Sequence, residues 1–256
     1  MNVLVFDIET VPDIESGRRL YDLEEIPASD VARAMSHLRL QQTGRDLLPH
    51  HLQRIVAISI ALRAGNIFRL WSLGNENSSE AELLQRFYDG IERFNSTMVS
   101  WNGCGFDLPV IHYRSLLHGI AAPRYWDTGE ADPSFRYNNY LNRFHWRHID
   151  LMDVLAGYNP RAFAPLDQLA TMLGLPGKMG MSGGKVWEAF QGGDIIGIRN
   201  YCETDVLNTL LIYLRFELMR GQLNANAFQR ECQLARDALA AMDRPHLTEF
   251  LSRWKS

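Results

Sequence analysis

The chain opens on a run that changes from apolar to acidic, Val3-Leu4-Val5-Phe6-Asp7-Ile8-Glu9. Apolar residues on both alternating faces of this run predict a central strand that is covered on both sides. Because side chains repeat every second residue along a strand, Asp7 and Glu9 emerge on the same face. Two like charges beside a core repel each other and are costly to desolvate, so the pair needs a compensating charge.

Bound cations would supply that charge. Carboxylate oxygens suit Mg²⁺ or Mn²⁺, and the neighbouring sequence lacks the Cys and His set that zinc prefers. In the alternative interpretation, Asp7 and Glu9 end a strand in solvent and bind no metal.

A second acid follows another short strand. The β-prone residues 97–101 break into the turn Asn102-Gly103-Cys104-Gly105, and a helix is predicted from about Leu108 to His118. Asp107 stands where that helix begins, so it is either a site residue or an ordinary N-cap. Asn102 also has two interpretations, because an Asn-Gly pair readily adopts positive φ in a turn.

A third acidic segment lies in the helix that the apolar spacing predicts over residues 194–216. Tyr201 and Asp205 are four residues apart and therefore share a face of this helix. Apolar residues occupy the same face, so Asp205 lies near the packed side and needs a partner there. A buried tyrosine hydrogen-bonded to an aspartate is the purely structural alternative.

Together and in this order, three segments resemble the exonuclease motifs of the DEDD superfamily in its tyrosine-bearing branch: Phe6-Asp7-Ile8-Glu9-Thr10, the run from Asn102 to Asp107, and the run from Tyr201 to Asp205. The nearest likeness is to stand-alone predicted exonucleases related to the 3′–5′ proofreading domain of B-family DNA polymerases. Branches that use histidine to orient water carry it close before the last aspartate, and Tyr201 holds that place here.

The resemblance covers residues 3 to about 221 and implies a ribonuclease H-like α/β fold, with a central mixed sheet flanked by helices. It predicts an exonuclease domain over residues 1–221, with an insertion at about 12–53, and a C-terminal helical appendage over 222–256. No polymerase module fits in the remaining residues.

The function that this resemblance implies is a two-metal-ion 3′–5′ exonuclease, which hydrolyses phosphodiester bonds from the 3′ end of single-stranded nucleic acid, with DNA slightly favoured. Asp7 would bridge two Mg²⁺ or Mn²⁺ ions. Glu9 and Asp205 would hold one of them, and Asp107 would act on the other or through water. Tyr201 would orient the attacking water, since a phenol of pKa about 10 is a poor base at neutral pH.

Five residues are predicted to contact the nucleic acid: Thr10, Asn102, Phe106, Lys178 and Lys185. The loop from Lys178 to Lys185 lacks the spacing of a nucleotide-binding P-loop and is expected to be a lysine-bearing loop near a phosphate.

Two longer segments are further candidates. Residues 12–53 are expected to form a long loop that serves as a flap over the strand being cut. The segment from Phe135 to His148 interleaves aromatic, amide and basic residues, which either stack on unpaired bases or pack against the core. Asp150 and Asp153 lie at a strand-to-helix junction, where capping is favoured over metal binding.

Composition limits the remaining classes. The chain has 256 residues, 46% of them hydrophobic and 22% charged, as expected of a single-domain globular enzyme. A net charge of −4 disfavours a purely electrostatic nucleic-acid binder. No apolar stretch reaches transmembrane length, and three unpaired cysteines favour a reducing cytoplasm. The alternatives are an inactive nuclease-like scaffold that binds nucleic acid and a phosphoesterase that acts on short oligonucleotides.

Overall fold

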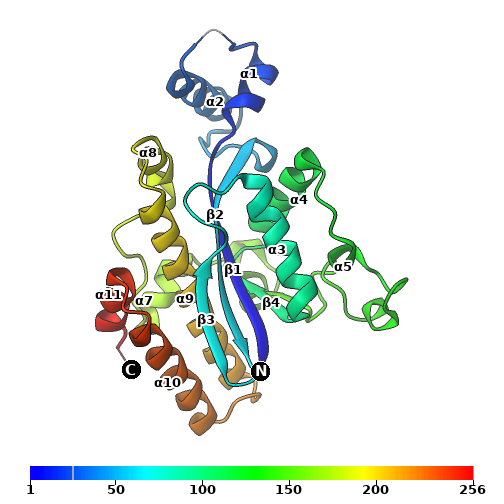
Figure 1. Ribbon diagram of the computed structural model, residues 1–256, viewed down its shortest axis with the longest axis vertical. Helices are drawn as coiled ribbons and strands as arrows, with labels where there is room; N and C mark the ends of the chain where they lie inside the picture. The colour runs from blue at the N-terminus through cyan, green and yellow to red at the C-terminus, as the bar shows by residue number, and fades with distance from the viewer. Residues whose placement is uncertain (25, 256) are drawn as a thin grey trace.

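The computed structural model describes residues 1–24 and 26–255. Five strands form one mixed sheet in the order β3-β2-β1-β4-β5 (Figure 1). Their bounds are Asn2–Pro12 for β1, Gln53–Ala64 for β2, Ile67–Ser72 for β3, Thr97–Ser100 for β4 and His148–Asp150 for β5. The central strand β1 pairs antiparallel with β2 and parallel with β4. The predictions of a central first strand and of an α/β fold with a mixed sheet are confirmed.

Helices flank the sheet on both sides. One side carries α3 (Glu80–Phe94), α4 (Asp107–His118) and α5 (Pro123–Trp126), and the other carries α9 (Ile195–Met219), α10 (Ala225–Ala241) and α11 (Pro245–Arg253). The shorter helices α6 (Leu151–Leu155), α7 (Leu166–Met172) and α8 (Val186–Gln191) connect β5 to α9. Within the described part of the chain, no helix is long and apolar enough to cross a membrane.

The alternation of β1 determines which helices its acids meet. Leu4, Phe6 and Ile8 pack in the hydrophobic cluster that contains α3 and α4 residues. Val3 and Val5 point the other way, into the cluster that contains α9 residues. Asp7 and Glu9 continue this second register. The α9-facing side of β1 therefore changes from apolar to acidic halfway along the strand.

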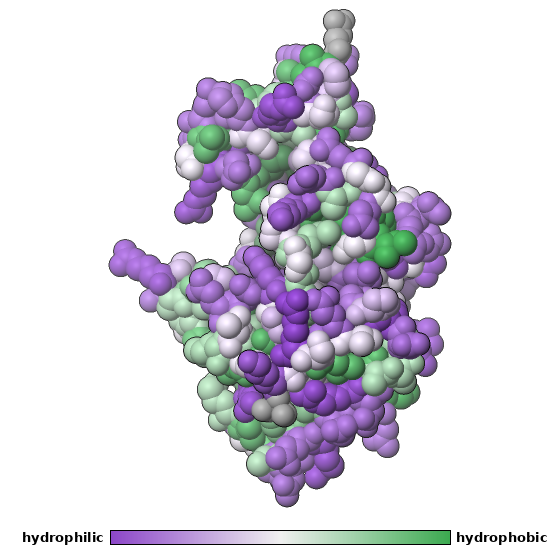
Figure 2. All heavy atoms as spheres, turned by 90° about the vertical axis from the view of Figure 1, so that its left-hand side faces the viewer, coloured by the Kyte–Doolittle hydropathy of each residue, from purple (hydrophilic) through white to green (hydrophobic). Residues whose placement is uncertain are grey.

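Residues 12–53 form a small helical lobe, whereas the sequence suggested a loop. The lobe contains α1 (Ile14–Tyr21), α2 (Ala28–Thr43) and the 3₁₀ helix η1 (His50–Leu52). Its helices have a cluster of their own, in which Met35 and Leu52 are buried. Gly17 permits the close contact between α1 and α2, since a Cβ there would lie 2.2 Å from Met35 Sδ. The lobe stands off from the sheet (Figure 1), and it forms one end of the molecule in the space-filling view (Figure 2).

The C-terminal helices α10 and α11 share the core of the sheet. Ala235, Leu239 and Phe250 are buried in the same cluster as Val3 and Val5. These helices pack against α9, and α10 also contacts β3. A helical C-terminal segment is thus present, while its separation from the nuclease domain at residue 221 stays a prediction.

A buried ion-pair network connects the end of β1 to the helices of the α3 and α4 side. The Arg114 guanidinium, on α4, is only 4% exposed and pairs with Asp13 and with Glu80. Its Nε and Nη2 atoms lie 2.8 and 2.6 Å from the two Glu80 carboxylate oxygens. Glu80 also accepts the Ile55 N–H at 2.6 Å. One cation therefore neutralises two acids from different elements.

Replacing Arg114 with Met should destabilise the protein strongly, because it leaves the buried Asp13 without its cation and the buried Glu80 with only the His118 ring, at 2.8 Å. We expect the free energy of unfolding to fall by about 3 to 5 kcal/mol in urea titrations. The control is Arg86→Met, which removes the exposed ion pair to Glu82 and should cost less than about 1 kcal/mol. Equal losses in the two variants would contradict the role given to Arg114.

Candidate active site

The acids of β1 meet α9 at a buried cysteine. One carboxylate oxygen each of Asp7 and Glu9 and the Cys202 Sγ lie within 4.8 Å of one another. The Cys202 thiol lies 3.3 Å from the Asp7 carbonyl oxygen and 3.7 Å from Asp7 Oδ2, and it donates to both. Burial, reinforced by the charges of Asp7 and Glu9, holds the thiol pKa well above its usual value. Cys202 therefore stays protonated and orients Asp7 rather than serving as a thiolate ligand.

Asp107 reaches the same place from α4. It is the first residue of that helix, and Phe106 occupies the cap position without a side-chain capping bond. The Asp107 Oδ1 atom instead accepts the Ile8 N–H at 3.2 Å, between Asp7 and Glu9 in the chain. The capping interpretation of Asp107 is therefore wrong, because its carboxylate bonds across to β1.

The turn before Asp107 is anchored by Asp150. Asn102 adopts a φ of 63°, so its use as the turn residue is confirmed. The backbone N–H groups of Asn102 and Cys104 donate to the two Asp150 carboxylate oxygens at 2.9 and 2.8 Å. Asp150 Oδ1 also accepts the Met152 N–H at 3.1 Å and so caps α6, as predicted. This acid fixes the loop that carries Asp107.

A second group of potential ligands, Cys104, Asp150 and Asp153, lies beside this anchor. Asp153 is paired with Arg143 at 2.6 Å, and Asp150 is occupied by backbone N–H groups. Burial and the charges of Asp150 and Asp153 raise the pKa of the Cys104 thiol to about 12. The two carboxylates are therefore already paired, and the Cys104 thiol keeps its proton. This group of residues does not suit a cation.

Tyr201 and Asp205 complete the group from α9. Burial raises the Asp205 pKa to about 6, although a side-chain hydrogen bond from Tyr201 and the charge of Lys178 oppose the shift. Burial, then the charges of Asp205 and Glu9, raises the pKa of the Tyr201 phenol. The phenol is thus a donor at neutral pH. The predicted sharing of one helix face by Tyr201 and Asp205 is confirmed.

The four carboxylates act on one another electrostatically. Burial and then the charges of Asp107, Glu9 and Asp205 hold the Asp7 pKa well above its usual value. The Glu9 pKa is raised by burial and by the charges of Asp205 and Asp107, and the positive charge of Lys178 opposes this shift. Burial raises the Asp107 pKa to about 7. An excess of buried negative charge on oxygen donors fits hard divalent cations. Asp7, Glu9, Asp107 and Asp205 are the residues that could hold them.

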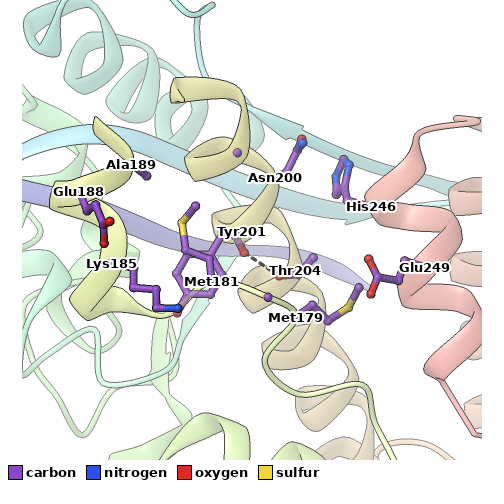
Figure 3. A pocket seen from close by; sticks show the side chains of 12 residues that line it. Met179, Met181, Lys185, Glu188, Ala189, Asn200, Tyr201, Thr204, His246 and Glu249 are labelled. Carbon is purple, nitrogen blue, oxygen red and sulfur yellow. Dashed lines mark hydrogen bonds between the residues drawn. The ribbon is translucent and has the colours of Figure 1, made fainter. Parts of the chain in front are cut away.

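A cavity of about 500 Å³ opens beside Tyr201, between the loop before α8 and the start of α11. Lys185, Met181 and Glu188 line it together with the Tyr201 ring (Figure 3). The Lys185 side chain extends toward Tyr201 in this view. The lysine loop therefore brings Lys178 to the carboxylates and Lys185 to the tyrosine.

The remaining predicted contacts lie around the site in different environments. Thr10 is half-buried and donates to Gln53 at 2.9 Å. The Phe106 ring lies 5.6 Å from the His50 ring. Asn102 lines another cavity, of about 600 Å³, to which Arg143 also contributes.

The aromatic and basic segment over residues 135–148 divides between its two interpretations. Phe135 and Tyr140 are buried, as the packing alternative required. Arg147 lies 3.8 Å above the Phe135 ring and so covers the core. Tyr137, which is 85% exposed, and Phe144, which is 63% exposed, remain available to a ligand.

Two features of the site have no signal in the local sequence. The contact of Cys202 with Asp7 depends on how α9 crosses β1. His50 Nε2 lies 2.9 Å from the Gly105 carbonyl oxygen, so the insertion touches the loop before Asp107. No local sequence signal connects residues 55 positions apart.

Comparison with known protein families identifies the family of this chain. Residues 45–254 match the family described as a predicted 3′–5′ exonuclease related to the exonuclease domain of PolB. The chain belongs to this exonuclease family. The resemblance drawn from the three motifs and the ribonuclease H-like fold class are thereby confirmed. No curated protein matches the chain. The family match begins at residue 45 and does not include Asp7 and Glu9. These two residues are assigned to the candidate site because the structure places them there.

An Asp107→Asn variant should be more stable than the wild type in EDTA, with a difference that depends on pH. The asparagine can still accept the Ile8 N–H but carries no charge. Folding raises the Asp107 pKa from 3.8 to about 7, so the folded protein binds more protons in this window and its stability falls as pH rises.

Thermal melting should therefore show no difference near pH 4 and an advantage for Asp107→Asn that grows until about pH 7 and reaches about 2 to 4 kcal/mol. The control is Asp132→Asn, because hydrogen bonds from Ser134 lower the Asp132 pKa and should give the opposite sign. A difference that stays constant with pH would show that the Asp107 charge is not the cause.

Proposed function

We propose that this member of the exonuclease family is a metal-dependent 3′–5′ exonuclease that acts on the 3′ ends of single-stranded nucleic acid, with DNA slightly favoured. The observation that carries the proposal is the convergence of Asp7, Glu9, Asp107 and Asp205 from three chain segments, with raised carboxylate pKa values. A scaffold that only bound a polyanion would gain nothing from this charge.

Divalent cations held by these acids would polarise the scissile phosphate, activate water and stabilise the leaving 3′ oxygen. Asp7 is oriented for its role by the Cys202 thiol, and Asp107 by the Ile8 N–H. Tyr201 keeps its proton and donates a hydrogen bond to Asp205, so its oxygen can accept a hydrogen bond from the attacking water and position it. This geometry supports a positioning role for Tyr201 and argues against its use as a base.

The substrate would approach over cationic and aromatic side chains. Lys178 places a positive charge near Glu9 and Asp205, where a phosphate must enter an acidic site. Lys185 offers a second cation in the cavity beside Tyr201. Phe106 supplies a ring for the terminal base, and we propose that the lobe over residues 12–53 is the flap that His50 holds against the Gly105 carbonyl.

Cleavage should require a divalent metal and should begin at the 3′ end. On a 5′-labelled single strand with Mg²⁺ or Mn²⁺, we expect a ladder that shortens from the 3′ end, no cleavage in EDTA, and a loss of several orders of magnitude in Asp7→Asn. Blocking the 3′ end with a bulky group should slow the reaction. Internal cleavage of the blocked strand at an unchanged rate would identify an endonuclease instead.

Replacing Tyr201 with Phe should lower the rate of cleavage while leaving strand affinity nearly unchanged. The ring and its packing remain, and the loss of one positioned hydroxyl should cost roughly tenfold to a thousandfold in kcat. The matched control is Tyr213→Phe, which removes a buried phenol that is hydrogen-bonded to Glu217 on the same helix with the same four-residue spacing. If both variants cut at the wild-type rate, the role given to the Tyr201 hydroxyl is wrong.

A further inference from the structure

A groove separate from the carboxylates runs between α9, α10 and the C-terminal residues. Its volume is about 850 Å³, the largest of the cavities described here. Four cations and two aromatic rings line it, with amide side chains between them: Arg215, Arg230, Arg236, Lys255, Phe228 and Trp254. Among the described residues that line the groove there is no carboxylate.

The cations of this groove are not neutralised by acids that the structure describes. Arg215 and Arg230 are exposed, and neither forms an ion pair within residues 1–24 and 26–255. The acids nearest to them in sequence are engaged elsewhere, because Glu217 pairs with Arg220 at 2.7 Å and Glu231 pairs with Arg63 at 2.5 Å. Such a concentration of positive charge is unexpected in a chain of net charge −4. Its complement is a polyanion.

The aromatic rings lie directly against these cations. The Arg215 Cζ atom is 4.7 Å from the centre of the Phe228 ring, and the Arg236 Cζ atom is 3.8 Å from that of Trp254. Trp254 is only 7% exposed and Arg236 covers its ring, so the rings hold the guanidinium groups in place, and the cations are what the groove offers to a phosphate backbone.

A short, fixed segment joins the groove to the active site. Leu175 lines the groove, and the Lys255 N–H donates to the Gly174 carbonyl at 3.2 Å. Asn208, fully buried on α9, holds Gly177 through two hydrogen bonds of 3.0 and 3.2 Å. The next residue, Lys178, is the cation that acts on Glu9 and Asp205. The inner end of the groove is thus three residues from the catalytic charges.

We infer that this groove binds the phosphate backbone of the substrate strand upstream of the 3′ end that is being cut. The inference rests on the proposed function and extends it to the path of the strand. Between Asn226 and Arg236, α10 rises about 15 Å, a length that accommodates more than one phosphate of a single strand. The groove would retain long strands and would not contribute to the binding of a dinucleotide.

The test compares two variants that remove the same charge. Arg215→Gln/Arg230→Gln neutralises the groove. Arg69→Gln/Arg93→Gln is the control, because these two exposed arginines line a hollow beside β3 and α3, and the Arg93 Cζ lies 5.4 Å from the Phe94 ring. Binding of an oligothymidylate of about twenty nucleotides is measured in EDTA at several salt concentrations. Thermal melting checks that both variants are folded.

The groove variant should bind the long strand more weakly. The negative slope of log K against log salt should become shallower by about 1.4, because two phosphate contacts are lost. The control slope should match the wild type, Arg215→Lys/Arg230→Lys should restore the slope, and hydrolysis of a thymidine dinucleotide with Mg²⁺ should be unchanged in all variants. Equal slopes in the groove and control variants would overturn the inference.

Two further outcomes separate this inference from the proposed function. If polyglutamate of matched charge binds the wild type more tightly than oligothymidylate and loses binding in the groove variant, the occupant is an acidic protein segment and the inference is wrong. If the wild type cuts no strand under any metal condition, the proposed function fails. The salt slope measured in EDTA still decides whether the groove binds nucleic acid.

Discussion

The burial of like charges where β1 crosses α9 is the constraint on which the rest of the structure depends. On the side of β1 that buries Val3 and Val5, the next two residues are Asp7 and Glu9. The acids therefore lie directly at the edge of the hydrophobic core. The two other acids arrive from α4 and α9, and burial raises the pKa values of the group. The fold keeps these charges together although they oppose its stability, as expected where function and stability compete.

Three other buried acids, Glu203, Glu80 and Asp13, have cationic partners that the site acids largely lack. Glu203 lies two residues before Asp205 on α9 and is also buried. Its pKa is lowered, because hydrogen bonds from His246 and Arg244 outweigh the effect of burial. Glu80 and Asp13 form ion pairs with Arg114. The site acids have neighbouring acids, a thiol, a phenol and one lysine in place of such partners, an arrangement that leaves room for divalent cations.

The elements around the acids hold them in place, and under the proposed function they would also admit a strand. Asp150 secures the turn at Asn102, which sets the start of α4 and hence the direction of Asp107. The 174–178 segment links the Lys178 charge to the groove over α10, and the lobe over 12–53 reaches the loop at Gly105 through His50. A strand that follows cations from α10 to Lys178 would enter the acidic site from its least repulsive side.

The sequence by itself determined the alternation of β1, the shared face of Tyr201 and Asp205, the turn at Asn102 and the family, because each depends on local periodicity or on motif order. Tertiary structure alone decided that Asp107 bonds to Ile8, that Cys202 orients Asp7 and that residues 12–53 fold as helices on their own cluster. It also brought together the groove cations, which come from α9, α10 and the last residues of the chain. Such contacts depend on how distant segments cross, and no local pattern encodes the crossing of two elements.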